Sequence, residues 1–239
     1  MSQGQKLVAI GVFVVGIAMV VACVRSVSDD ASAVPRPTPT PVNLRILLEH
    51  SGKVMESLES FHYLLDHESG TTIINSSLAI DKAEGDVISP DRISTEFSGS
   101  VGGFPIKARL ITLGDSSYMT NFLSGKWEIV PPDVSPLQFF DPKNGITSIM
   151  SRVDHLRLLA DDTETYRISG RLSAEALAPI LGDTLKEAVL IVELTLDRES
   201  LYLLKIVIDG RVTSSEPDGT VRLIVLSRFN QVETIESPL

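Results

Sequence analysis

The chain has 239 residues, and its 31 Asp and Glu against 21 Lys and Arg give a formal net charge of −10 at pH 7. This acidic balance argues against a nucleic-acid partner, because phosphates demand a basic face. It also argues against electrostatic binding to anionic lipid head groups, whereas a neutral or apolar partner is compatible with it. Cys23 is the only cysteine, so nothing predicts a disulfide, an iron–sulfur cluster or a Cys-based zinc site.

An uncharged apolar stretch over residues 7–23 follows Lys6 near the start of the chain. A positive charge, an apolar stretch and small residues before a cleavage site are typical of a secretory signal. The stretch ends in Val20-Val21-Ala22-Cys23, which resembles a bacterial lipobox and implies diacylglyceryl attachment to the Cys23 thiol. The sequence therefore predicts a signal peptide over residues 1–22 and a lipoprotein anchored by Cys23 on the outer face of the cytoplasmic membrane.

An uncleaved membrane anchor is the alternative interpretation of the same stretch. Leu7 to Val24 spans 18 residues, near the lower limit for crossing a hydrocarbon core of about 30 Å. A single N-terminal transmembrane anchor, a lipid anchor and simple secretion all place the rest of the chain outside the cytoplasm. Lys6 is the only charged side chain of residues 1–22, so cleavage would change the net charge from −10 to −11.

The segment over residues 23–42 is predicted to be a tether for one domain over residues 43–239. Its prolines at positions 35, 37, 39 and 41 alternate with other residues, which favours an extended polyproline-type spacer. At about 3 Å per residue, this spacer would hold the domain tens of ångströms from the membrane. A proline-rich docking motif for a protein partner is the less favoured alternative.

The first predicted elements of the domain are a helix and an antiparallel meander. Asn43 is a suitable N-cap for a helix that continues to about Ser60, with its leucines at helical spacing on one face. Alternating apolar residues and Gly, Asp and Pro punctuation then predict short strands. These strands lie around residues 61–66, 71–81, 93–98, 104–113 and 117–121, with a turn at 89–91, a flexible link at 99–103 and a further turn before Trp127.

A proline-rich segment over residues 131–142 interrupts the meander. Ile146, Ile149, Met150 and Val153 then predict a short amphipathic helix. Two strands are predicted over residues 155–159 and 165–171, and Ser173 is a suitable cap for a helix to about Leu181. Three long strands, over residues 187–196, 201–212 and 220–229, end the domain.

The last strands carry apolar residues on both faces. In the first of them Val189 and Ile191 face one side, and Leu190, Val192, Leu194 and Leu196 face the other. Strict alternation in the next strand places Leu203 and Ile206 on opposite faces. Because a sheet with one wet face should alternate apolar with polar residues, we expect helices to cover one face and another layer or an apolar ligand to cover the other.

A series of short motifs runs through the domain in a fixed order. They are Ser60-Phe61-His62, Ser89-Pro90-Asp91-Arg92-Ile93, Tyr118 leading to Gly125-Lys126-Trp127, Thr165-Tyr166-Arg167-Ile168-Ser169-Gly170 and the terminal Ser237-Pro238-Leu239. Together with the lipobox and the Pro/Thr tether, they resemble the LppX/LprAFG family of bacterial lipoproteins over about residues 40–239.

The resemblance implies an α+β fold: a strongly curved antiparallel β half-barrel with helices packed on its concave side. This shape is similar to that of the LolA/LolB carriers, which move lipoproteins to the outer membrane. The resemblance also implies a large apolar cavity in which a lipid or glycolipid is carried or presented across the cell envelope, with a membrane transporter as a candidate partner. The family supplies no catalytic residue and no cofactor, so we expect none here.

Six apolar residues of the predicted strands are expected to line this cavity: Tyr63, Phe97, Leu110, Val192, Leu194 and Ile206. A register error of one residue would turn any of them to the other face. Trp127 is interpreted as a packing anchor, with a guard at a pocket mouth as the alternative.

The polar residues predict neither a metal site nor a catalytic one. His62 and His67 flank an acidic pair, but alternation directs them to opposite faces, whereas zinc needs three or four converging ligands. The cluster of Asp161, Asp162 and Glu164 is interpreted as a turn rather than a calcium loop. Neither G-x-S-x-G nor H-E-x-x-H occurs. The alternative function is a non-catalytic surface adaptor with a filled core that binds a protein partner.

Overall fold

The computed structural model describes residues 42–74, 78–131, 145–181 and 183–239. The predicted signal peptide, Cys23 and nearly all of the predicted tether therefore lie outside the described residues. The proline-rich segment 131–142 also lies outside them, except for residue 131. Within the described part, no helix is both long enough and apolar enough to cross a membrane.

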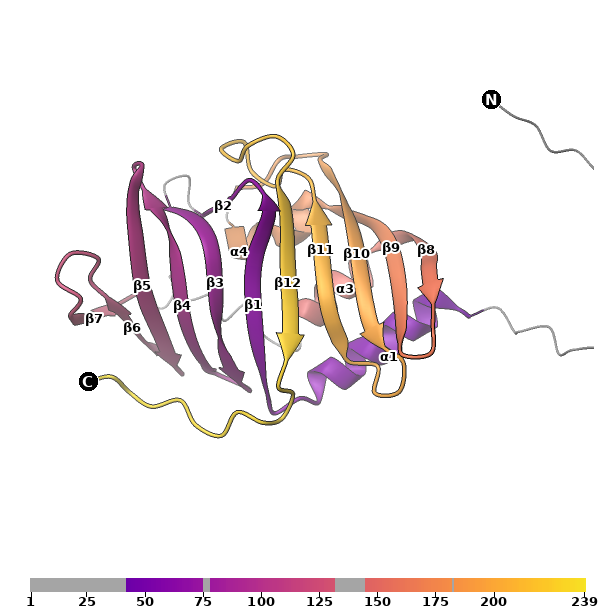
Figure 1. Cartoon of the computed structure of the whole chain (residues 1–239), viewed down its shortest axis with the longest axis horizontal. Coiled ribbons are helices and arrows are strands. Elements are labelled where there is room, and N and C mark those ends of the chain that lie inside the picture. The colour runs from indigo at the N-terminus through magenta and orange to yellow at the C-terminus, as the bar shows by residue number, and fades with distance from the viewer. Residues whose placement is uncertain (1–41, 75–77, 132–144, 182) are drawn as a thin grey trace, which may run out of the picture. The chain divides into compact units, whose positions relative to one another are not determined.

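Most of the described chain forms one antiparallel sheet (Figure 1). Its strands are β1 (Ser60–Ser69), β2 (Thr72–Ile74), β3 (Leu78–Ile88), β4 (Arg92–Val101), β5 (Phe104–Leu113), β6 (Ser116–Thr120), β7 (Trp127–Val130), β8 (Asp154–Asp161), β9 (Thr165–Ser173), β10 (Val189–Asp197), β11 (Leu203–Asp209) and β12 (Val221–Ser227). They lie in the order β7-β6-β5-β4-β3-β1-β12-β11-β10-β9-β8, with β2 beside β3. The first strand pairs with the last, so the two ends of the domain meet in the middle of the sheet.

Two glycines of the N-terminal half allow neighbouring strands to approach closely. A Cβ on Gly85 would lie 2.0 Å from the carbonyl oxygen of Ser94, and one on Gly99 would lie 1.8 Å from that of Ala79. Only glycine fits such positions, and glycine kinks are a means by which a sheet acquires curvature. The sheet is curved and remains unclosed, with its two outermost strands, β7 and β8, far apart in the order (Figure 1). The predicted half-barrel is therefore confirmed.

The helices lie on the concave side of the sheet, mostly over its C-terminal half (Figure 1). They are α1 (Leu44–Glu56), α3 (Ile146–Arg152), the 3-10 helix η2 (Ala174–Leu177) and α4 (Ala178–Leu181). The predicted caps are confirmed, because the Ile46 N–H donates to Asn43 Oδ1 at 3.2 Å and the Glu175 N–H donates to Ser173 Oγ at 3.3 Å.

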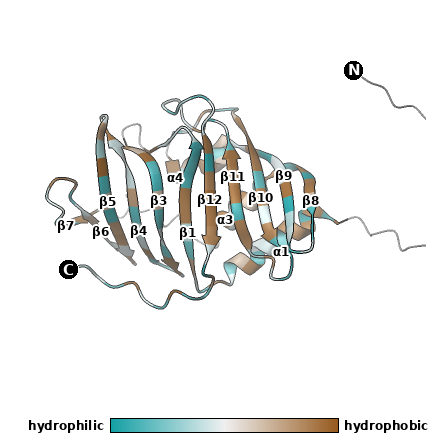
Figure 2. Cartoon of the chain, viewed as in Figure 1, coloured by the Kyte–Doolittle hydropathy of each residue, from teal (hydrophilic) through white to brown (hydrophobic). Residues whose placement is uncertain are grey.

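The two longer helices, α1 and α3, pack against each other, and both also contact the sheet. Thr147 Oγ1 donates to the carbonyl oxygen of Gly52 at 3.2 Å, and Arg45 donates to the carbonyl oxygens of Ser151, at 3.0 Å, and Val153. On the sheet side, Ser51 Oγ of α1 donates to the carbonyl oxygen of Leu201 at 2.8 Å. Figure 2 shows that the strands beneath, β10 to β12, are rich in hydrophobic residues.

Two predicted elements of the N-terminal half are wrong. The single strand over residues 71–81 is a pair, because Thr72 of β2 lies opposite Ile80 of β3. Between them lie Asn75, Ser76 and Ser77, residue types that favour turns. This signal was not recognised in the sequence because apolar residues continue on either side of it. The flexible link over residues 99–103 is largely strand, because β4 continues to Val101. Only Gly102 and Gly103 adopt turn conformations, with φ of +57° and +82°.

A β-bulge overturns the predicted faces of β11. Lys205 lies opposite Thr195, but Leu203 lies opposite Leu196, so Leu204 is an extra residue in the ladder. The bulge resets the alternation, and Leu203 and Ile206 are therefore both buried.

The predicted alternation in β10 matches the observed burial. Leu190, Val192, Leu194 and Leu196 are buried, whereas Val189 and Ile191 are 59% and 46% exposed. Among the residues that the structure describes, none forms a second layer over Val189 and Ile191. The expected alternative, an apolar ligand that covers this face, stays a prediction.

Candidate functional site

The six residues predicted to line a cavity are all buried, none being more than 8% exposed. The structure divides them between the two halves of the sheet. Val192, Leu194 and Ile206 lie in β10 and β11, under the helices. Tyr63 lies in β1, the strand that pairs with β12, and Phe97 and Leu110 lie beyond it in β4 and β5.

The C-terminal three share a small apolar cavity of about 20 Å³. This volume is close to that of one water molecule, and a cavity with only apolar walls stays dry. Helix α3 covers the cavity with residues that the sequence placed on an amphipathic helix but did not assign to a site. The lining consists of Ile146, Ile149, Met150, Val153, Leu172, Leu177, Val192, Leu194, Ile206 and Ile208.

The N-terminal three belong to a wall with a buried polar pair. Tyr63, Gly85, Thr95 and Leu110 lie in one row across β1, β3, β4 and β5. Because Gly85 has no side chain, the Tyr63 ring reaches across β3, and its hydroxyl lies 2.6 Å from Thr95 Oγ1. Burial raises the pKa of the Tyr63 phenol far above its usual value, although the bond to Thr95 opposes this effect. The phenol is therefore neutral at physiological pH.

Small side chains surround the next row of the same wall. Phe97 lies opposite Ala83 on one side and Ala108 on the other. Further along, Thr112 Oγ1 and Ser117 Oγ are 2.9 Å apart and buried. The wall thus combines apolar residues with hydroxyl groups that bond to one another, and sequence alternation alone did not reveal these pairs.

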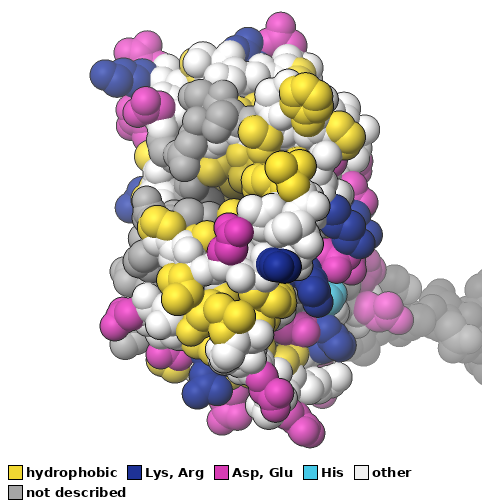
Figure 3. Space-filling model, turned by 90° about the vertical axis from the view of Figure 1, so that its left-hand side faces the viewer, with side chains coloured by type: hydrophobic (Ala, Val, Ile, Leu, Met, Phe, Trp, Pro, Cys, Tyr) yellow, Lys and Arg dark blue, Asp and Glu magenta, His cyan; other side chains and the backbone are white. Residues whose placement is uncertain are grey.

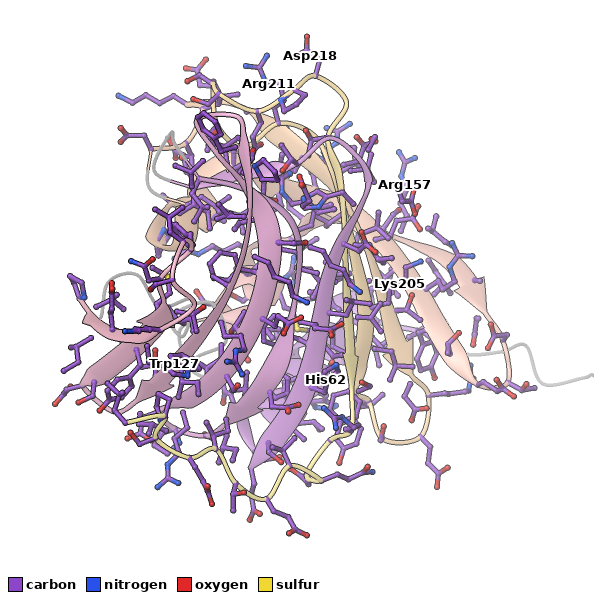
Figure 4. All side chains as sticks on the ribbon, turned by 60° about the vertical axis from the view of Figure 1, so that its left-hand side comes forward. His62, Trp127, Arg157, Lys205, Arg211 and Asp218 are labelled. Carbon is purple, nitrogen blue, oxygen red and sulfur yellow. The ribbon has the colours of Figure 1, made fainter. Side chains whose placement is uncertain are left out.

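The histidines near the start of the sheet do not converge. His62 Nδ1 lies 2.8 Å from Asp86 Oδ1, beside Arg228, low on β1 in Figure 4. His67 Nδ1 instead lies 2.7 Å from the carbonyl oxygen of Asp81. Among the residues that the structure describes, no three His, Cys, Asp or Glu side chains gather in a way that could hold a metal ion.

The acidic cluster after β8 is a turn. Asp162 Oδ1 accepts the N–H groups of Thr165 at 2.6 Å and Glu164 at 2.9 Å. These backbone bonds hold the pKa of the Asp162 carboxyl below its usual value. The carboxylate is thus engaged by its own loop, as expected for a turn.

A buried ion pair, absent from the sequence predictions, fastens the loop between β11 and β12. The side chains of Arg222 and Glu216 are 4% and 0% exposed and contact each other directly. Arg222 Nε donates to Thr72 Oγ1 of β2 at 2.8 Å, and Glu216 accepts the N–H of Val212 at 2.7 Å. This network holds the loop to the end of the sheet, so we interpret it as a stabilising contact rather than a binding site.

Comparisons with known proteins agree on one relationship. The model of the family described as LppX_LprAFG lipoprotein matches residues 43–232. LprF from Mycobacterium bovis superposes with a TM-score of 0.63 and 20% identity, covering 81% of this chain and 96% of that one. Lipoprotein LppX from Mycobacterium tuberculosis superposes with a TM-score of 0.56 and 16% identity, covering 82% and 100%. Among curated protein sequences, none matches significantly.

Proposed function

Because the chain belongs to the LppX_LprAFG lipoprotein family, we propose that it is an exported lipoprotein that binds an apolar lipid or glycolipid on the concave side of its half-barrel. It carries or presents this ligand across the cell envelope. The observation that supports this proposal is the wholly apolar cavity between α3 and the sheet. The binding is non-covalent, and no residue of the chain acts as a catalyst.

The ligand enters by displacing α3, because a cavity of about 20 Å³ is too small for an acyl chain. Helix α3 has only seven residues, and its N-cap residue, Gly145, has no side chain that could cap the helix. Its contacts with the sheet in this cavity are apolar, so an acyl chain can replace them without leaving polar groups of the sheet unpaired. The cost of displacement lies instead in the hydrogen bonds between α3 and α1, those of Thr147 and Arg45. Each CH₂ group buried by the ligand contributes about 0.8 kcal/mol.

The anchor is the second part of the proposal. The thiol of Cys23 carries the lipid, and residues 24–42 link it to the half-barrel. Labelled palmitate should be incorporated by cells that express the full chain and not by cells that express Cys23→Ala. Equal incorporation by the two chains would contradict the lipobox interpretation.

Extraction of the purified full chain with organic solvent, followed by mass spectrometry, tests the carrier function. We expect a stoichiometric lipid. In Val192→Phe the added ring fills the cavity, so the amount of bound lipid should fall. Ile191→Phe is the matched control, since Ile191 is the exposed neighbour on the same strand, and its lipid content should be unchanged.

A surface adaptor with a filled core is the second candidate function. The small volume of the cavity favours it, because the C-terminal half is already nearly filled by its own side chains. A full chain that is consistently empty, and that also fails to bind fluorescent lipids, would support the adaptor and reject the carrier.

A further inference from the structure

The hairpin between β6 and β7 presents apolar side chains to solvent at one end of the sheet. Leu123 is 99% exposed, Phe122 is 41% exposed, and Ile129 on β7 is 76% exposed. Figure 1 shows the hairpin projecting beside β5, and Figure 3 shows hydrophobic patches on the side of the molecule that faces this end. Neighbouring exposed apolar residues of this kind indicate a contact surface.

Four backbone N–H groups of the hairpin tip have hydrogen-bond partners within the tip itself. Asn121 Oδ1 accepts the N–H groups of Leu123 and Ser124, both at 3.0 Å. The Gly125 N–H donates to the carbonyl oxygen of Asn121 at 2.9 Å, and the Lys126 N–H donates to Ser124 Oγ at 3.3 Å. In a medium without water each unpaired backbone group is costly, so these four bonds lower the cost of moving the tip into an environment poor in water.

The charge of the tip differs from that of the whole chain. From Asn121 to Trp127 the single charged residue is Lys126, which is exposed, although the chain as a whole carries −10. Trp127 is half-buried, with the Arg109 guanidinium 5.1 Å from its ring centroid. A basic group beside Trp, Phe and Leu is the combination found where proteins rest in a membrane interface.

We infer that the β6–β7 hairpin is a docking element that inserts Phe122 and Leu123 shallowly into a lipid bilayer. The exposed apolar area is only a few side chains, whereas a stable protein interface needs about 800 Å² per partner. A lipid surface requires no such area when an anchor already holds the domain nearby, because the tether raises the effective concentration. The inference rests on the proposed carrier function, which requires contact with the membrane that supplies or receives the ligand.

The chain contains its own probe for this contact. Trp127 is the only tryptophan, and it follows the tip directly on β7, as labelled in Figure 4. The full chain is reconstituted into phosphatidylcholine vesicles whose acyl chains are either brominated or unmodified. Bromine quenches indole fluorescence only at short range, so we expect the emission of Trp127 to be lower in the brominated vesicles.

Two matched variants assign the quenching to the tip. Leu123→Asp changes a fully exposed residue, and it should reduce the docked population at least about tenfold and abolish the quenching. Phe104→Asp changes another exposed apolar residue, 76% exposed at the start of β5, and it should leave the quenching intact. Absence of quenching in the unmodified chain, or equal quenching in Leu123→Asp, would overturn the inference.

The lipid content of the same preparations separates this inference from the carrier function. Leu123→Asp should retain as much bound lipid as the unmodified chain, because Leu123 lies outside the concave face. Quenching without bound lipid in any preparation would reject the carrier and support the docking hairpin. Bound lipid without quenching would reject the docking hairpin and support the carrier.

Discussion

The two halves of the sheet share one alternation but differ in what the buried positions hold. In β9 to β12 these positions are mostly branched aliphatic residues, such as Ile168, Leu190, Leu194 and Ile208. In β3 to β6 many of them are small or hydroxylated. This second group includes Ala83, Thr95, Gly99, Ala108, Thr112, Ser117 and Thr120. The same period of two therefore produces a core filled with aliphatic side chains in one half and a wall of lower side-chain volume in the other.

The helices explain why the C-terminal half is filled. Helices α1 and α3 place Leu48, Met55, Ile146 and Met150 over this half, and all four are buried. In the N-terminal half the buried hydroxyls instead pair with each other, as Tyr63 does with Thr95. A buried polar group is tolerated when it has a hydrogen-bond partner. The C-terminal half therefore buries aliphatic side chains under helices, whereas the N-terminal half buries hydroxyl groups that are hydrogen-bonded.

The largest expected effect comes from a charge in the filled half. Leu194 is 3% exposed, and Leu194→Asp buries an unpaired carboxylate there. We expect a loss of more than about 4 kcal/mol, which approaches the whole stability of a typical domain. Ile191→Asp, on the exposed face of the same strand, should cost about 0.5 kcal/mol or less. Urea unfolding followed by circular dichroism measures both, and similar midpoints for the two variants would refute a filled C-terminal core.

A smaller effect is expected from a side chain at a close strand approach in the N-terminal half. In Gly99→Val the new Cβ would lie 1.8 Å from a backbone oxygen of β3, so the strands must separate. We expect a cost of about 2–4 kcal/mol. Gly102→Ala is the control, because its Cβ would meet nothing within 4 Å and only its φ of +57° opposes alanine, at about 1–2 kcal/mol. Thermal unfolding of the two variants ranks them, and the reverse order would contradict a close approach of β3 and β4 at Gly99.

The buried polar pair of the N-terminal wall should contribute less. Tyr63→Phe removes the hydroxyl that bonds to Thr95 Oγ1, and we expect a loss of about 1–2 kcal/mol at neutral pH. Urea unfolding near pH 7 measures this difference. An unchanged midpoint would show that the pair is not a net stabilising contact.

The same variant tests the raised pKa of Tyr63. Since the folded pKa lies above the unfolded value of 10.0, the folded chain retains a proton that the unfolded chain releases at high pH. The contribution of this residue is therefore fully present below pH 10 and is lost as the pH rises from there, by about 1.4 kcal/mol per pH unit. The difference in stability between the unmodified chain and Tyr63→Phe should shrink over this range. A constant difference would contradict the burial of a neutral phenol.

The smallest effect is expected on the solvent face of the C-terminal half. Arg167 Nη2 lies 3.2 Å from Glu193 Oε2, and both side chains are more than 40% exposed. Arg167→Gln should therefore cost about 0.5 kcal/mol and less at high salt, because exposed ion pairs are weak and screened. A cost above 2 kcal/mol would show that this face is not free in solution.

Sequence patterns anticipated the elements whose signals are local. The Asn43 and Ser173 caps and the alternation of β10 depend on residues a few positions apart, and each of them is observed. The bulge at Leu204 was missed because it depends on how β11 pairs with β10. The division of this segment into β2 and β3 was missed because apolar residues continue on both sides of residues 75–77.

For the candidate site too, the sequence predicted what depends on local pattern and missed what depends on contacts between distant residues. Alternation selected six residues that are all buried, and their contact with a ligand stays a prediction. It did not reveal that Val192, Leu194 and Ile206 share a cavity under α3, because α3 is distant in sequence from these strands. Nor did it pair Tyr63 with Thr95 across Gly85, which requires three strands to lie side by side.

By itself the sequence determined an acidic chain, its family, and an antiparallel sheet with short capped helices, and it predicts export. Composition, the lipobox and residue periodicity are encoded within short windows, so they can be interpreted without coordinates. The tertiary structure decided which half of the sheet the helices fill, how small the remaining cavity is, and that Phe122 and Leu123 lie exposed at a hairpin tip. These properties depend on strand order, register and close approach between distant residues, which short windows do not contain.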